Sequence, residues 1–204
     1  MNDLYKTIAS SSEGQFRDKG SRFLAFAYHV ETEEETREIL VEIRKRYHDA
    51  RHHCFAWRLG PEMNLFRVND DGEPSGSAGK PILGQLRSRE LTDTMVVVVR
   101  YFGGTLLGVG GLINAYRTAA SEALDRATII EKRVETLLQI EFGYQVMNQV
   151  MKLVKEYELG MATQQFDTRC KMTVRAWIRD LQAIMDRFER IGNCRVARME
   201  NEKL

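Results

Sequence analysis

Cysteine is scarce in this chain of 204 residues, and its three copies stand far apart, at Cys54, Cys170 and Cys194. No CxxC pair occurs, so the sequence predicts neither a disulfide framework nor a zinc knuckle. Long apolar runs are also missing, since the run from Met95 to Val99 is far shorter than the roughly 20 residues that cross a bilayer. The first residues lack the basic and apolar segments of a secretory signal. We therefore expect a cytoplasmic protein without a membrane span.

An excess of one charge is missing too. Thirty Lys and Arg residues against 29 Asp and Glu give a net charge of +1, so no overall positive field marks the chain as a nucleic-acid binder. Any basic binding surface must be local. With 43% apolar and 29% charged residues, the composition is that of a folded globular chain and not of a disordered one.

The first part of the chain mixes strand and helix patterns. Thr32 followed by Glu35 is the start signal of a helix, and the run from Met95 to Val99 is typical of a central strand buried on both faces. The apolar spacing predicts, in chain order, a strand at 23–30, a helix after Thr32, strands at 54–59 and 65–68, a short helix from Pro81, a strand at 95–99 and a helix from Gly108.

From about Val134 the pattern restarts. It predicts a strand at 136–142, a helix at 144–157, strands at 161–166 and 170–177, a helix at 178–191 and a strand at 194–199. This β-α-β-β-α-β order is that of ferredoxin-like domains. We therefore predict an α+β protein with two domains, residues 1–132 and 133–204, separated at the charged stretch Glu131 to Arg133.

The glycine-rich turn after residue 99 is the strongest local signal for binding. Glycine lets backbone N–H groups approach a phosphate, and the start of a helix adds a partial positive charge. The turn does not match the G-x-G-x-x-G pattern of dinucleotide sites, and Gly79-Lys80 does not complete a P-loop. The alternative is that these glycines only permit tight turns and close packing of helix on sheet.

Adjacent histidines and a cysteine at positions 52–54 suggest a metal site, but neighbouring strand residues point to opposite faces. At most one histidine can then face the acidic loop that follows. The sequence leaves two interpretations of His52 open: a general base oriented by a carboxylate, or a histidine bonded to loop backbone. No metal set or cofactor fingerprint is complete, so we expect no cofactor.

The acidic loop holds Asp70, Asp71 and Glu73. Their clustered oxygens are suited to a cation, although the alternating acids of a calcium loop are absent. A solvated turn with Asx capping is the alternative. These three residues form a candidate polar site without an assigned chemistry.

Four segments together resemble the IMPACT/YigZ family: Asp70 to Pro74, Ala78 to Pro81, Val97 to Gly104 and Leu107 to Leu112. The likeness extends to Lys19 to Phe23, Ala50 to Cys54 and Ala115 to Arg117, and the second domain resembles the small C-terminal domain of bacterial members. The resemblance implies two domains similar to domains IV and V of elongation factor G, which contact the ribosome. Eukaryotic relatives regulate translation and carry an N-terminal accessory domain. Residues 1–22 are too few to hold it, so we do not expect the partner-binding role of these relatives to transfer.

We therefore expect a translation-linked regulator that binds structured RNA or the ribosome and catalyses no reaction, with translation factors as further candidate partners. The candidate nucleic-acid or anion-binding residues are Arg51, His52, Lys80, Arg100, Gly103, Gly104, Gly108, Gly110 and Gly111. The alternative is an enzyme acting on a small phosphorylated or acidic substrate. It would hold the substrate with the same loops and use His52 or Glu73 as a base.

Overall fold

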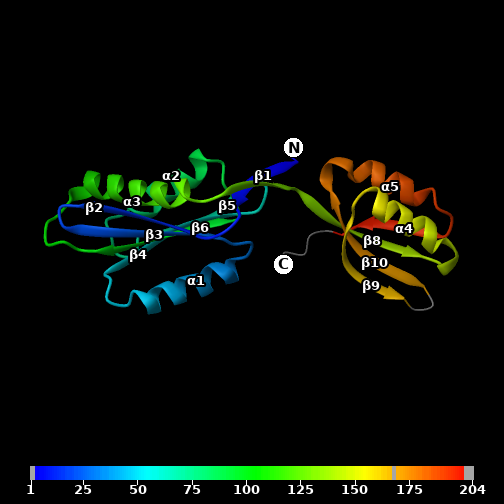
Figure 1. Ribbon diagram of the computed structural model, residues 1–204, viewed down its shortest axis with the longest axis horizontal. Coiled ribbons are helices and arrows are strands. Elements are labelled where there is room, and N and C mark those ends of the chain that lie inside the picture. Colours follow the sequence, from blue (N-terminus) through cyan, green and yellow to red (C-terminus); the bar gives the residue numbers. More distant parts are fainter. Residues whose placement is uncertain (1–2, 167–168, 200–204) are drawn as a thin grey trace. The chain divides into compact units, whose positions relative to one another are not determined.

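A computed structural model describes residues 3–166 and 169–199 of the chain (Figure 1). The chain divides into two compact units, Tyr5–Lys132 and Met1–Leu4 with Arg133–Leu204, which we call the N-terminal and C-terminal units. Each unit combines helices with an antiparallel sheet, so the predicted α+β class is confirmed. Within the described ranges, no helix is both long and apolar enough to cross a membrane.

The N-terminal unit is built on a five-stranded sheet with the order β2-β3-β6-β4-β5. Its strands are β2 (Ser12–Asp18), β3 (Ser21–His29), β4 (His52–Leu59), β5 (Leu65–Asn69) and β6 (Thr94–Tyr101), and all neighbours run antiparallel. The central strand is β6, as its β-branched run predicted. Its residues from Thr94 to Arg100 are all buried.

Helices cover both faces of this sheet (Figure 1). One face packs against α2 (Gly79–Ser88) and α3 (Gly108–Asp125), and the other against α1 (Glu33–Arg46). Side chains alternate along β6, so that Val96 and Val98 lie in the core beneath α2 and α3 whereas Val97 and Val99 lie beneath α1. The predicted cap of α1 is confirmed, because the Glu35 backbone N–H donates to the Thr32 hydroxyl at 3.2 Å.

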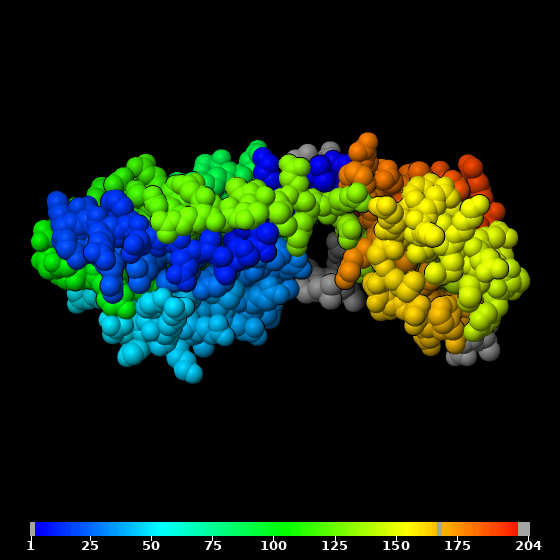
Figure 2. Space-filling view, in the orientation of Figure 1, coloured from blue at the N-terminus to red at the C-terminus, as the bar shows by residue number. Residues whose placement is uncertain are grey.

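The first strands were not predicted. β1 (Leu4–Ile8) pairs with β7 (Ile129–Arg133) in a separate two-stranded sheet, and β2 forms an edge of the five-stranded sheet. In the space-filling view, the blue N-terminal strands lie at the surface between green helical residues and cyan residues (Figure 2). Strand β2 carries few apolar residues, which is why the hydrophobic pattern did not reveal it.

The C-terminal unit contains the elements in the predicted succession. They are β8 (Glu135–Phe142), α4 (Met147–Glu156), β9 (Gly160–Phe166), β10 (Cys170–Trp177), α5 (Leu181–Glu189) and β11 (Cys194–Arg198), with short 3-10 turns before α4 and α5. The sheet has the order β11-β8-β10-β9. Asp3 belongs to this unit because its carbonyl accepts hydrogen bonds from the Val134 backbone and the Trp177 ring.

The loops with the predicted site residues gather at one end of the five-stranded sheet. The register pairs Asp18 with Ser21, and His52 with Arg100, so β2 and β6 end where β3 and β4 begin. The loop after β5 and the loop after β6 lead from this end into α2 and α3. We call this the glycine-rich end. The opposite end holds the starts of β2 and β6 and the C-terminal end of α3, where the Ser12 hydroxyl donates to the Ala123 carbonyl.

Candidate functional site

A buried ion pair lies inside the glycine-rich end. Arg100, near the end of β6, is flanked by Phe23 on β3 and His52 on β4. The Arg100 side chain is only 6% exposed, and its Nη1 donates to Oε1 of Glu73 at 2.5 Å. The Tyr116 hydroxyl of α3 donates to the same oxygen at 2.7 Å. Glu73 therefore joins the central strand, the loop after β5 and α3.

A thiol and a phenol extend this network. The Cys54 sulfur lies 3.0 Å from the Asp70 carbonyl oxygen and 3.3 Å from the Tyr116 hydroxyl. Burial raises the pKa of the Cys54 thiol and of the Tyr116 hydroxyl far above their usual ranges. Both groups therefore stay protonated at neutral pH, so Cys54 is not an activated nucleophile.

Asp70 shapes the loop between β5 and α2. Its carboxylate accepts the backbone N–H groups of Gly76 at 2.8 Å, Ala78 at 3.0 Å and Gly79 at 2.8 Å. Burial raises the pKa of Asp70, but the three N–H donors and the nearby Lys80 outweigh it, so the pKa lies below its usual value. Asp70 thus caps α2, whose own N-cap residue offers no side-chain hydrogen bond.

His52 and His53 point to opposite faces of the sheet, as predicted. The Nδ1 atom of His52 lies 2.8 Å from the Asp71 carbonyl, and because a carbonyl only accepts, Nδ1 carries the proton. His53 uses Nε2 in the same way on the Tyr47 carbonyl at 3.0 Å. Both histidines therefore bond to loop backbone, which is the second of the two interpretations of His52. Among the described residues, no three metal-ligating side chains form a group.

The glycines after β6 differ in how far their positions require glycine. A Cβ added to Gly103 would lie 1.9 Å from the Gly20 carbonyl carbon, so two backbones touch there. Gly104 and Gly108 have φ of +86° and +72°, which side chains disfavour. Gly110 has neither constraint, because nothing lies within 4 Å of an added Cβ. Close packing therefore explains why position 103 is glycine, but it does not explain why position 110 is glycine.

The outer surface of the glycine-rich end is basic. Seven exposed cations lie on or beside its loops, and among the described residues none of them has an acid within ion-pairing distance: Arg17, Lys19, Arg22, Lys45, Arg46, Arg51 and Lys80. At the opposite end, Arg58 and the exposed Arg87 also have no acid within ion-pairing distance among the described residues, but other cations are paired. Lys6 meets Glu90 at 3.1 Å and Arg126 meets Glu122 at 3.4 Å, for example. A chain that is nearly neutral overall thus carries a local positive surface.

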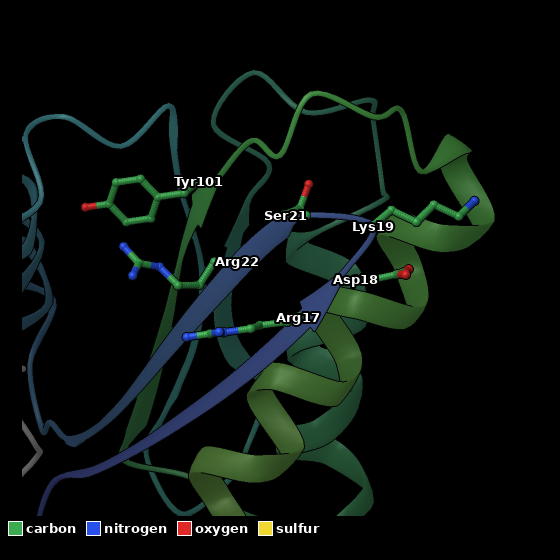
Figure 3. A pocket seen from close by; sticks show the side chains of 7 residues that line it. Arg17, Asp18, Lys19, Ser21, Arg22 and Tyr101 are labelled. Atoms are coloured by element: carbon green, nitrogen blue, oxygen red, sulfur yellow. The ribbon is translucent and has the colours of Figure 1, made fainter.

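A groove of about 510 Å³ opens beside the β2–β3 turn (Figure 3). It is lined by Arg17, Asp18, Lys19, Gly20, Ser21, Arg22 and Tyr101. Sequence reasoning did not find the groove, because it did not predict β2. The Lys19-Gly20 pair is a turn signal that would have placed the two flanking segments side by side.

The structure places the predicted site residues in two groups. Arg51, Lys80 and the loop glycines Gly103, Gly104, Gly108 and Gly110 are exposed, with Gly111 half-buried. Asp70, Asp71 and His52 are half-buried, whereas Glu73 and Arg100 are buried. Arg100 was expected to contact an anion directly. Its charge is instead balanced by Glu73 inside the fold, so it holds the loop in position.

Comparison with known proteins agrees with the resemblance seen in the sequence. The Impact N-terminal domain family model matches residues 19–124. IMPACT family member YvyE of Bacillus subtilis is 37% identical over 156 residues, which cover 76% of this chain and 72% of that protein. IMPACT family member YigZ of Escherichia coli is 41% identical over 128 residues, covering 61% and 63%.

A solved crystal structure of a hypothetical protein is also similar, with a TM-score of 0.79 and 27% identity. The match covers 99% of this chain and 100% of that one. The family domain spans β3, the acidic loop, Arg100 and most of α3, so the glycine-rich end lies almost wholly within the matched region. On these grounds the chain belongs to the IMPACT family.

Proposed function

We propose that this chain binds structured RNA, of the kind found in the ribosome, through the glycine-rich end of its N-terminal unit. In this proposal the protein is a translation-linked regulator and catalyses no reaction. The observation that carries the proposal is the gathering of seven exposed cations around an open glycine loop, none of which has an acid within ion-pairing distance among the described residues.

Electrostatics supports this choice of ligand. Phosphates attract Lys and Arg, and exposed backbone N–H groups near glycine add donors that need no side chain. Lys80, in the first turn of α2, and Arg51, in the loop before β4, are both exposed at the same end, so they can meet separate phosphates of one polyanion. Double-stranded or folded RNA, recognised mainly by shape and backbone, suits such a surface.

The architecture is compatible with the same proposal. The β-α-β-β-α-β succession and the sheet order β11-β8-β10-β9 fit a ferredoxin-like C-terminal domain. We propose, following the sequence resemblance, that the two units correspond to domains IV and V of elongation factor G. A relation of that kind favours a ribosomal ligand over an unrelated anion.

An enzyme acting on a small acidic substrate has less support. It requires His52 or Glu73 as a base in contact with substrate, yet Glu73 is shared between Arg100 and Tyr116. The unprotonated Nε2 of His52 lies 3.9 Å from Oε1 of this same Glu73, and the His52 side chain is only 15% exposed. These side chains hold the loop after β5 in place. Loss of turnover with retained RNA affinity in a Glu73 variant would favour the enzyme.

The test is co-sedimentation with ribosomes and with extracted ribosomal RNA across a salt series. Binding of the parent should be saturable and should weaken steeply as salt rises. The Arg51→Gln, Lys80→Gln variant should bind about tenfold more weakly, with a shallower salt dependence. The control Arg37→Gln, Arg126→Gln removes two exposed cations at the opposite end and should bind like the parent. No binding of the parent at low salt, where attraction is strongest, would overturn the proposal.

A second candidate function is contact with a protein partner such as a translation factor. Three apolar side chains lie exposed on and beside the glycine loop: Phe102 at 41%, Leu106 at 83% and Val109 at 54%. An apolar tip of this kind suits a protein surface. Leu106→Ser should abolish capture of purified translation factors while RNA affinity stays within twofold. If Leu106→Ser captures translation factors as well as the parent does, these apolar side chains are not a protein-binding site.

A further inference from the structure

We propose that the groove beside the β2–β3 turn is a phosphate subsite in which Arg17 and Arg22 together hold the sugar-phosphate backbone of RNA. The inference rests on the proposed function and deepens it, because it names the group that is recognised and the residues that recognise it. Arg17 and Tyr101 lie outside the residues first selected from the sequence. Arg22 belonged only to the family resemblance.

The two arginines face each other across the hairpin. The register of β2 and β3 places Arg17 directly opposite Arg22, and both side chains are exposed. Like charges in directly opposed positions destabilise a sheet. Within residues 3–166 and 169–199, neither guanidinium has a carboxylate within ion-pairing distance, and Asp49 attracts Arg22 only from beyond that distance. An anion seated between them would remove the repulsion, so the pair is arranged for a ligand that carries negative charge.

The Arg22 side chain is held in place by stacking on an aromatic ring. Its guanidinium carbon lies 4.6 Å from the centre of the Tyr101 ring, and these residues are paired across β3 and β6. Tyr101 is fixed in turn, because its hydroxyl donates to Asp49 at 2.8 Å. A stacked guanidinium keeps the N–H groups of its edge available for hydrogen bonds, and less side-chain entropy is lost when an anion binds.

The turn beside the arginines is tightly packed. Gly20 has φ of +81°, and its backbone touches that of Gly103 so closely that neither position has room for a Cβ. The Gly103 N–H donates to the Ser21 hydroxyl at 3.2 Å, which ties the turn to the end of β6. The groove therefore has a fixed floor, and a preformed site of this volume accommodates a nucleotide-sized group.

The directions of the side chains favour an anion on one side of the turn. In Figure 3, Arg17, Arg22 and Tyr101 extend to the same side, whereas Asp18 and Lys19 extend away from it. The carboxylate of the groove is thus directed away from the arginine pair. Planar guanidinium groups match phosphate by forming two hydrogen bonds at once, which a point charge such as Lys cannot do.

RNA is favoured over an acidic peptide as the source of this charge. Lys19 lies in the turn that lines the groove, and Arg51 is bonded to the strand end beside it, since its backbone N–H donates to the Arg100 carbonyl next to Tyr101. A chain with one negative charge at every nucleotide can occupy several of these positions at once. An acidic peptide also carries repeated charges, so the choice of RNA rests on the function proposed for this end of the sheet.

The test compares the full chain with two double variants, using a fluorescein-labelled RNA hairpin of roughly 16 base pairs. Arg17→Gln, Arg22→Gln should raise the dissociation constant about ten- to a hundredfold and reduce the salt slope by roughly 1.5 to 2. Arg17→Lys, Arg22→Lys keeps the charge, so its slope should match the parent while its affinity falls about three- to tenfold. Arg37→Gln, Arg126→Gln is the control and should change the affinity less than twofold. Equal affinity of the parent and the Gln variant would overturn the inference.

Other outcomes test the phosphate subsite in the groove independently of the proposed RNA binding. If the Arg51→Gln, Lys80→Gln variant loses binding and the Arg17→Gln, Arg22→Gln variant does not, the groove is not the phosphate subsite, but the proposal of RNA binding stands. If the parent fails to bind the hairpin, titration with inorganic phosphate, followed by the NMR signals of the Arg17 and Arg22 side-chain Nε–H groups, decides whether an anion site exists. Competition by a poly-glutamate peptide that matches competition by unlabelled RNA would replace RNA with an acidic protein segment.

Discussion

Charged side chains are compensated in the interior of the glycine-rich end but not on its surface. Inside, Arg100 is paired with Glu73, and the Asp70 carboxylate accepts three backbone N–H groups. Outside, Arg17 lies opposite Arg22, and in the part of the chain that the structure describes neither has an acid within ion-pairing distance. A buried charge must be compensated within the fold, whereas an exposed charge is solvated by water and stays available to a ligand. The comparison suggests that interior residues determine stability and surface residues determine binding.

The largest expected effect breaks the interior pair. Glu73→Gln should lower the free energy of unfolding by about 3–5 kcal/mol, because it leaves the Arg100 charge buried and uncompensated. Urea denaturation followed by circular dichroism measures this loss. The double variant Glu73→Gln, Arg100→Met should recover part of it, since no unpaired charge then remains. A loss below about 1 kcal/mol for Glu73→Gln would show that the pair does not stabilise the loop.

The next effect concerns the close approach of two backbones. Gly103→Ala should destabilise the protein by about 2–3 kcal/mol, because the new Cβ would meet the Gly20 carbonyl carbon at 1.9 Å and the turn would have to move. A thermal melt of the variant beside the parent measures the change. A melting temperature equal to that of the parent would mean that the β2–β3 turn is not packed against the glycine loop.

Removing the cap of α2 should have a smaller and pH-dependent effect. Asp70→Asn should lower the stability by about 1–2 kcal/mol at neutral pH. The folded state lowers the pKa of Asp70, so its contribution is complete above the unfolded value of about 3.9 and is lost as the pH falls through the folded value. The difference between variant and parent should therefore be constant from pH 7 to about 5 and shrink below about 4. A difference that grows in acid would assign the effect to another group.

Local features of this fold followed from the sequence, and long-range pairings did not. The cap by Thr32, the buried strand around Val97 and the opposed directions of His52 and His53 depend on residues a few positions apart. The Arg100–Glu73 pair depends on a β5–α2 loop folding back over the central strand, which periodicity does not report. Arg100 was therefore predicted as an anion-binding residue and not as the partner of a buried carboxylate.

The surface site shows the same limit. Arg17 and Arg22 are five residues apart, and a predicted hairpin would have placed them opposite each other. Strand β2 lacks the alternation of apolar residues that identifies a strand, since Phe16 is its only large apolar side chain. The alternating signal is weak where a strand lies at an edge and carries mostly polar residues. Sequence patterns thus recover the core more readily than the binding surface.

The smallest expected effect on stability gives the sharpest contrast between interior and surface. Gly110→Ala lies in the first turn of α3, where an added Cβ meets nothing within 4 Å, so helix propensity should raise the stability by up to about 1 kcal/mol. If the open backbone there serves to approach a phosphate, the same variant should bind the RNA hairpin about three- to tenfold more weakly. Gly103→Ala, in contrast, should lose stability first, and its binding should fall only as far as the turn is displaced. Fluorescence anisotropy with the hairpin, at a temperature where both variants are folded, separates these effects. Higher stability with unchanged affinity in Gly110→Ala would place the ligand away from the first turn of α3 and confine it to the arginine groove.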